Sequence, residues 1–571
     1  MNPRSDDSDA FPSSPDPKNT LQIPPTAPSP PSPLQSLQES TSSSSRSTAS
    51  FRQHSSDPVQ PPSIQAHYYA GLPSRPLLLA STRPDALLAP PSSRFAVQKH
   101  LYPIALDHSI CSVWDKTIAP FVMRLIDSHY TDGGVCIDAV RIGYNQEDAI
   151  TTIWIGLPRN ALSPQLAGTI VKAIKDFSLA KGADQFEVEM RSTSVEQLSK
   201  LIDPDDLNAQ LYRLADPFCL TLGTPISTAN DPHYIGTGGI FISLPNHDHL
   251  FMVTAQHVVS HDGNAERSPF SDQAPISIRL DVPKRFLERQ REVEQKIADS
   301  AAMIALTESR IDQARQKDRD CSRLEENHQF LTKSHSVLKE WSRRLDTEFG
   351  NESLRTFAHA FAFPPRRYNV GGAEDNSQSA SGYTEDWAVV ATDVELDESN
   401  VNSIRLTDDE DRTLARRYPD QKPQLDDNVL DSLKVTGFLS EEELATGSFA
   451  VLMRGASSSL RLGVTNGVKS YVRIDSGQIR QWSKEVSILN LSESGRYSYA
   501  GQFSKEGDSG ATVVDRMGRI CGVLTSGANQ DEKVPIEEGS REFKAVDVTY
   551  VTPWWWIVER MRAFGLEPTV V

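Results

Sequence analysis

Residues 507–525 read GDSGATVVDRMGRICGVLT, and this stretch decides the interpretation of the chain. Ser509 lies between Gly507 and Gly510 and is followed by apolar strand patterns at 512–514 and 520–524. A serine hydroxyl becomes a nucleophile when a base removes its proton, and flanking glycines let backbone N–H groups face a developing oxyanion. We expect the amides of Gly507 and Ser509 to form that oxyanion hole. A chain of this length contains Gly-Asp-Ser-Gly by chance roughly once in a hundred sequences. The motif therefore indicates catalysis only if the chain also provides a base and a carboxylate.

The candidate base is His257. It stands in Thr254-Ala255-Gln256-His257, directly after the apolar run 250–253. The imidazole ring, whose ordinary pKa is about 6.5, is the common general base. We expect most of the 13 histidines to be ordinary surface or core residues. We assign His247 and His249 to a solvated turn, despite a spacing that is typical of metal ligands. We predict no metal site and no cofactor.

The candidate carboxylate is Asp386, which precedes the apolar run 387–390. A catalytic histidine needs an acid that holds its tautomer and stabilises its cation. Asp393 competes more weakly for this role. The three motifs occur in the order His, Asp, Ser, each at the edge of a β pattern, and this order favours Asp386.

These segments resemble the three signature segments of the chymotrypsin family of trypsin-like serine proteases. The matching residues are Thr-Ala-x-His at 254–257, Asp-x-Ala-Val-Val at 386–390 and Gly-Asp-Ser-Gly at 507–510, in that family's chain order. The resemblance covers residues 217–565 apart from an insertion. It implies a double six-stranded β-barrel with the site between the barrels and a closing C-terminal helix, for which we expect Thr552 as N-cap, Pro553 at the first position and Gly565 past the end.

The resemblance also implies substrate-binding residues. Thr525, Ser526 and Gly527 are similar to the strand on which a substrate backbone pairs. Phe503 stands near the expected pocket floor, where trypsin-type enzymes carry an acid, so the resemblance favours a small or apolar substrate side chain.

Three departures distinguish this chain from secreted members of the family. Val258 replaces a disulfide cysteine, as in the high-temperature-requirement and viral enzymes that it resembles more closely. No Ile-Val-Gly-Gly activation site precedes the barrel, so Asp508 needs a partner other than a new amino terminus. Ala511 replaces a second glycine.

The region before the barrel divides into two predicted parts. Residues 1–95 are rich in Ser and Pro and are predicted to be a disordered tail. Residues 96–215 are predicted to be a small α+β domain, with helices at 118–126 and from Pro164 to Gly182, strands at 135–144 and 150–157, and a strand at 186–191 with one face in water.

A helical insertion is predicted at 284–349, which contains neither Gly nor Pro. Leu324, Leu331, Leu338 and Leu345 are spaced by seven residues, which indicates helix packed on helix. One helix of this length would end about 100 Å from its start, yet the chain must return to the barrel. We therefore expect an antiparallel hairpin that turns near Lys317–Asp320, with a dimeric coiled coil as the alternative. Residues 366–384 are predicted to be a flexible loop.

Composition restricts the partners. The 76 acidic residues exceed the 58 basic ones, and the net charge of −18 disfavours nucleic acid and anionic membranes. There is no signal-peptide pattern and no apolar run of membrane-spanning length, and the five cysteines form no CxxC pair. We expect an intracellular, cytoplasmic protein with reduced thiols.

The predicted function is that of a serine endopeptidase acting on a peptide or protein substrate through His257, Asp386 and Ser509. The alternative is an inactive protease-fold scaffold. In either case the helical hairpin is a candidate docking element for a protein partner.

Overall fold

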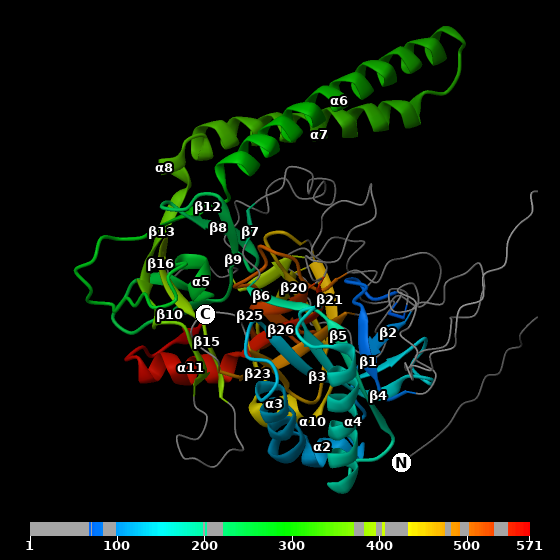
Figure 1. Cartoon of the computed structure of the whole chain (residues 1–571). Coiled ribbons are helices and arrows are strands. Elements are labelled where there is room, and N and C mark those ends of the chain that lie inside the picture. The colour runs from blue at the N-terminus through cyan, green and yellow to red at the C-terminus, as the bar shows by residue number, and fades with distance from the viewer. Residues whose placement is uncertain are drawn as a thin grey trace, which may run out of the picture. The chain divides into compact units, whose positions relative to one another are not determined.

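The computed structural model describes residues 68–69, 71–83, 99–197, 200–201, 221–370, 382–395, 402–405, 432–458, 460–473, 481–490, 502–529 and 546–571. In these ranges the protein is mostly β-structure, with a closed barrel, a half-barrel and several helices (Figure 1). No helix in these ranges has the length and apolar character to cross a bilayer.

The closed barrel carries the Ser509 segment. Its ladder runs β20-β21-β23-β26-β25-β24 and returns to β20, so every strand has two partners. Alternate side chains of a strand point inward, and Val451, Val486, Val513 and Val551 pack together in the interior. The strands are β20 (Ala450–Arg454), β21 (Leu460–Thr465), β23 (Ser483–Asn490), β24 (Thr512–Asp515), β25 (Arg519–Asn529) and β26 (Val546–Pro553).

The half-barrel carries the histidine and the aspartate. Its sheet runs β27-β10-β11-β16-β13-β12-β8-β9-β7, and β10 and β11 pair as a hairpin. β11 also pairs with β16, which places Thr254 opposite Ala388. The strands are β7 (Lys200–Leu201), β8 (Thr224–Thr228), β9 (Tyr234–Gly238), β10 (Phe241–Ser243), β11 (His249–Thr254), β12 (Ser277–Leu280), β13 (Thr356–Ala362), β16 (Ala388–Glu395) and β27 (Thr569–Val570).

The region predicted as a separate α+β domain shares a sheet with the closed barrel. β22 pairs with β23 of the barrel on one side and with β3 on the other, and the sheet continues through β4, β5 and β1. Helix α4 connects β4 to its parallel neighbour β5, and the Ser163 side chain caps its N-terminus. The elements are β1 (Leu78–Ser81), β2 (His100–Tyr102), α2 (Ser109–Val113), the π-helix η1 (Trp114–Ile118), α3 (Ala119–Asp127), β3 (Val135–Gly143), β4 (Ile150–Leu157), α4 (Pro164–Ala180), β5 (Phe186–Ser192) and β22 (Ser470–Arg473).

Two sequence predictions for this region are wrong. Part of the supposed tail is ordered, because Leu78–Ser81 forms strand β1 against β5; residues 1–67 and 84–95 lie outside the described residues. The polar face of β5 is not in water, because Glu189 and Arg191 are both buried. Glu189 accepts hydrogen bonds from the hydroxyls of Tyr68 and Tyr69, so the segment before β1 covers this face.

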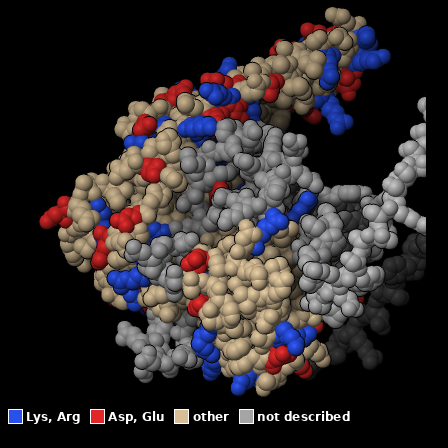
Figure 2. Space-filling model, viewed as in Figure 1, with Lys and Arg blue, Asp and Glu red and all other residues tan. Residues whose placement is uncertain are grey.

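The helical hairpin is present as an insertion between two paired strands. Helices α6 (Pro283–Gln316) and α7 (Ser322–Phe349) lie side by side between β12 and β13, and the turn falls where the sequence predicts it (Figure 1). Gln290 bonds to Asp346 and Arg315 to Glu325, which fixes the antiparallel register. The helix that each heptad pattern packs against is therefore the other helix of the same chain, as expected for the antiparallel hairpin. Charges of both signs are interspersed along the hairpin (Figure 2).

The base of the hairpin is held by the residue that follows β12 and by the loop after β20 of the closed barrel. The buried carboxylate of Asp281 pairs with Arg289 at 2.6 Å, and Arg285 donates to the carbonyl of Ala456. We expect deletion of 297–338 with a Gly-Ser turn to leave the free energy of unfolding within about 1 kcal/mol of wild type, and deletion of 284–349 to lower it by about 1–3 kcal/mol. Urea unfolding of the two variants checks this. Equal free energies of unfolding for the two deletion variants would contradict the anchoring role of Arg285 and Arg289 at the base of the hairpin.

Several smaller elements complete the described structure. The predicted loop 366–384 is strand at both ends, because β14 pairs with β15; residues 371–381 lie outside the described residues. The C-terminal helix begins one residue later than predicted: Pro553 is its N-cap, because Thr552 still pairs in β26. The remaining elements are β6 (Ser194–Gln197), α5 (Gln256–Val259), α8 (Glu352–Arg355), β14 (Arg367–Val370), β15 (Tyr383–Glu385), β17 (Ser403–Arg405), β18 (Ser432–Lys434), β19 (Gly437–Phe438), α10 (Glu441–Thr446) and α11 (Trp554–Ala563).

Candidate active site

The turn that carries Ser509 depends on its two glycines. Gly507 and Gly510 have φ angles of +92° and +89°, a region that side chains with a Cβ rarely adopt. A Cβ on Gly510 would also collide with the Thr254 hydroxyl and the Thr237 carbonyl. The sequence around Ser509 is therefore required by the shape of the turn.

Thr237 of β9 holds this turn from the half-barrel side. Its backbone N–H donates to the Ser509 carbonyl at 2.8 Å, and its hydroxyl donates to the Gly507 carbonyl at 2.9 Å. The same hydroxyl accepts from the amide of Ala456 at 2.9 Å. The sequence did not single out Thr237, because a threonine in a glycine-rich strand has no signature of its own.

Asp508 has the partner that the sequence analysis required. Its carboxylate accepts from the amides of Ser457 and Ser458, the Ser458 hydroxyl and the Lys505 amide, at 2.6–3.1 Å. Burial raises the pKa of Asp508, and these hydrogen bonds oppose that rise. Hydrogen bonds from the closed barrel thus hold Asp508 in place, in addition to those that Thr237 makes to the turn.

His257 and Asp386 form a buried pair. Nδ1 of His257 lies 2.6 Å from Oδ2 of Asp386, and the backbone amide of His257 donates to Oδ1 at 3.0 Å. Burial alone would raise the pKa of Asp386, but the charge and hydrogen bonds of His257 and the charge of Arg366 outweigh it and lower this pKa. An ionised carboxylate only accepts hydrogen bonds, so Nδ1 carries the proton and Nε2 is left as a base. Asp393 is exposed further along β16.

The histidine segment and the serine turn are in contact. Gly510 packs against Thr254 and Ala255, just before His257. His257 and Ser509 are 1% and 0% exposed, and within the described ranges Nε2 of His257 and Oγ of Ser509 have no hydrogen-bond partner. The structure therefore joins His257 to Asp386 and brings Ser509 to the adjoining segment, with no hydrogen bond between Ser509 and His257.

The amides predicted for an oxyanion hole are also uncommitted. No hydrogen bond from the N–H of Gly507 or Ser509 is seen to any residue that the structure describes. A substrate carbonyl oxygen that accepted a hydrogen bond from each of these two N–H groups would be polarised, which favours attack by a nucleophile on the carbonyl carbon.

The predicted substrate-binding residues divide into two groups. Thr525, Ser526 and Gly527 lie on β25, close to the serine turn, because the Gly510 amide donates to the Leu524 carbonyl. Phe503 is fully buried in the core of the closed barrel, so its ring contacts the barrel interior.

Glu485 is a buried acid near Asp386 that the sequence analysis missed. It accepts hydrogen bonds from the Thr384 amide and the Thr552 hydroxyl, each at 3.2 Å. Burial raises the pKa of Glu485 to about 7, and the negative charge of Asp386 adds to the rise. A single acidic residue in a strand gives no sequence signal of such an environment.

Glu485→Gln is expected to change the pH dependence of stability. The folded-state pKa of about 7 exceeds the ordinary value of 4.5, so stability from the protonated acid is present below pH 4.5 and is lost as the pH rises through 7. The difference of 2.5 units sets an upper limit of roughly 3 kcal/mol. Urea midpoints at pH 5 and pH 8 should show wild type losing stability relative to the Gln variant. A pH-independent difference would contradict this.

Neither the family models nor the curated proteins searched include a match to this chain. The functional argument therefore depends on the residues and their geometry.

Proposed function

We propose that the chain is a serine endopeptidase with a double β-barrel of the chymotrypsin type. The observation that carries the proposal is the buried His257–Asp386 pair beside the Gly507–Gly510 turn. Both β units contribute residues to the proposed site. His257 follows β11 and Asp386 precedes β16, which are strands of the half-barrel, whereas Ser509 precedes β24 of the closed barrel.

In the proposed mechanism, the substrate backbone takes the place of β6 along Thr525–Gly527, because β6 pairs with Ser526 and Gly527 in the structure. The substrate's carbonyl oxygen accepts hydrogen bonds from the amides of Gly507 and Ser509. His257 Nε2 takes the hydroxyl proton as Ser509 Oγ attacks the carbonyl carbon, and Asp386 stabilises the imidazolium. His257 then gives the proton to the leaving amine, and water hydrolyses the acyl-enzyme by the same route in reverse. The Ser509 hydroxyl has to come within hydrogen-bond distance of His257 Nε2 when substrate binds, because the two atoms are not hydrogen-bonded in the structure.

A fluorophosphonate probe tests the proposal, because it reacts with activated serines and is read by intact mass and peptide mapping. We expect modification of Ser509 in wild type and in His261→Ala, whose histidine is part-exposed on the same segment. We expect none in Ser509→Ala or His257→Ala. A folded chain whose Ser509 never reacts would instead favour the scaffold.

A further inference from the structure

The base of the helical hairpin and the serine turn contact the same loop. This loop, residues 455–458, follows β20 of the closed barrel. Arg285, in the first turn of α6, donates a hydrogen bond from Nη2 to the Ala456 carbonyl at 2.6 Å. The loop also donates three hydrogen bonds to the carboxylate of Asp508, the residue before Ser509. The insertion between β12 and β13 is therefore linked to the segment that carries Ser509.

A chain of hydrogen bonds continues from this loop to the proposed oxyanion hole. The Ala456 amide donates to the Thr237 hydroxyl at 2.9 Å, and that hydroxyl donates to the Gly507 carbonyl at 2.9 Å. Arg285, Ala456 and Thr237 are 6%, 2% and 0% exposed, so little water competes for these bonds. Three hydrogen bonds thus connect Arg285 of the hairpin to Gly507, whose amide we assign to the oxyanion hole.

Apolar packing follows the same route. Val282, the N-cap residue of α6, packs with Ala456 and with Ile235 of β9. Ile235 lies close to the serine turn, because a Cβ on Gly507 would come within 2.8 Å of its side chain. Protein interiors are close-packed and transmit strain. A shift at the start of α6 would therefore reach Gly507 through side-chain contacts as well as through hydrogen bonds.

The buried carboxylate of Asp281 helps to orient Arg285. One of its oxygens lies 3.8 Å from Nε of Arg285, and the other accepts a hydrogen bond from Arg289 at 2.6 Å. A buried guanidinium needs a counter-charge, and Asp281 supplies it while Nη2 of Arg285 is bonded to Ala456. The contact between the hairpin and the 455–458 loop is thus made from a buried ion-pair cluster.

We propose that the helical hairpin is a control element of the protease, and that its base fixes the oxyanion hole through Arg285. The inference rests on the proposed protease function. With the Arg285 bond in place, Ala456 and Thr237 hold the Gly507 carbonyl and hence the direction of the neighbouring amides. Without it, Ala456 can move, and the donors are no longer preorganised for the substrate's carbonyl oxygen. Arg285 is therefore a positioning residue, and binding of a partner to the hairpin can change activity only by moving its base.

Arg285→Met tests the proposal, because it removes the hydrogen-bond donor and keeps a long side chain. We expect kcat for a peptide substrate to fall roughly 10- to 100-fold, since misplaced oxyanion donors lose transition-state stabilisation. KM should change by less than about three-fold, because substrate binding is not affected in the same way. Labelling of Ser509 by fluorophosphonate should slow by a factor similar to that of kcat.

Two further variants separate positioning from a general loss of structure. Arg285→Lys keeps the charge and a donor, and should restore part of the lost kcat. Arg279→Met is the matched control, because Arg279 pairs with Glu352 at the same end of the insertion, and it should leave kcat unchanged. Thermal unfolding verifies that each variant folds. An Arg285→Met chain with the kcat of wild type would overturn the proposal, and so would an equal loss in Arg279→Met.

A double-variant comparison tests whether Arg285 acts through Thr237. Thr237→Val removes the hydroxyl in the middle of the hydrogen-bond chain. If the effect passes through this hydroxyl, adding Arg285→Met to Thr237→Val should lower kcat by less than about two-fold more. Independent, multiplicative losses would overturn the proposed route.

Deletion of 297–338 tests whether the base of the hairpin alone is responsible, because it leaves Asp281, Arg285 and Arg289 in place. We expect kcat within about two-fold of wild type, since distant sites act independently. Loss of activity in this folded variant would contradict control by the base.

The reactivity of wild type separates this inference from the protease function. A Ser509 that reacts with fluorophosphonate equally fast in wild type and in Arg285→Met leaves the protease function standing and rejects control by the hairpin. A folded wild type whose Ser509 never reacts rejects both proposals.

Discussion

Asp386→Asn is expected to lower kcat for peptide hydrolysis by about 10⁴-fold while leaving the fold intact. The carboxylate accepts two hydrogen bonds from His257, one from Nδ1 and one from the backbone amide. An asparagine can accept the backbone amide through its oxygen, but its NH₂ group then faces Nδ1. Nδ1 must become the acceptor, the proton moves to Nε2, and the base needed by Ser509 is lost.

The measurement is kcat and KM for hydrolysis of a peptide substrate. Asp393→Asn is the matched control, because Asp393 is exposed on β16, the strand that follows Asp386, and should leave kcat unchanged. Thermal unfolding verifies that the Asp386 variant folds. A kcat within ten-fold of wild type would show that Asp386 does not set the tautomer of His257.

The candidate triad could be predicted from sequence because each member belongs to a short motif at a strand end. His257, Asp386 and Ser509 follow or precede apolar runs, and local pattern is sufficient to place such residues. Thr237, Ser458 and Glu485 could not be found in this way. Their roles come from contacts with residues distant in sequence, such as the bond from Ser458 to Asp508, and an isolated sequence gives no sign of them.

The same reasoning explains the error about the region before the barrel. The strand and helix patterns at 135–191 were predicted well, since they depend on local periodicity. The pairing of β3 with β22 joins residues more than 300 positions apart, and nothing local encodes it. The alternation of charges in β5 was interpreted as solvent exposure, because a strand buried among polar partners has the same pattern as one facing water. Burial of Arg191 is the feature that separates the two cases.

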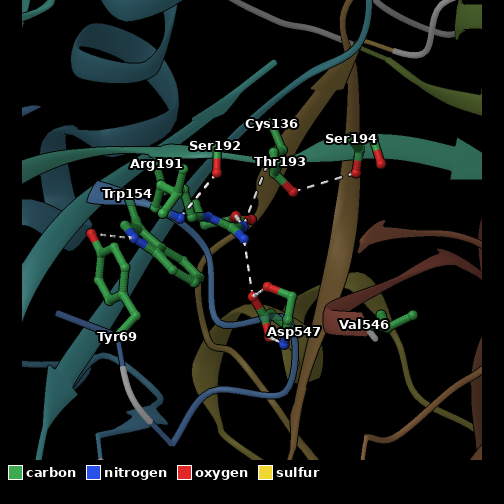
Figure 3. A network of polar contacts seen from close by, with 12 residues as sticks. Tyr69, Cys136, Trp154, Arg191, Ser192, Thr193, Ser194, Val546 and Asp547 are labelled. Atoms are coloured by element: carbon green, nitrogen blue, oxygen red, sulfur yellow. Dashed lines mark hydrogen bonds and ion pairs between the residues drawn. The ribbon is translucent and has the colours of Figure 1, made fainter. Parts of the chain in front are cut away.

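Arg191→Met is expected to lower the free energy of unfolding by about 3–5 kcal/mol. The guanidinium is fully buried, 3.3 Å from both Asp138 and Asp547, and it stacks on Trp154 at 3.4 Å from the ring centroid (Figure 3). Methionine retains most of the apolar contact with the ring, so the loss is electrostatic. Without the guanidinium, the carboxylates of Asp138 and Asp547 remain buried with no counter-charge from residue 191. The free-energy cost of these two buried charges exceeds the desolvation cost that is saved when the cation is no longer buried.

The pH dependence distinguishes this explanation from a packing defect. Burial already raises the pKa of Asp138 and of Asp547, and the positive charge of Arg191 limits the rise. In the variant both pKa values rise further above the unfolded value of 3.8, so stability is lost as the pH increases. Urea unfolding should therefore show a larger deficit at pH 8 than at pH 5. Arg562→Met, which removes an exposed ion pair with Glu567, should change stability little at either pH. A deficit for Arg191→Met that is equal at both pH values would assign the loss to packing, and the buried charges would then not be what fixes β5 and the start of β6 to the barrel.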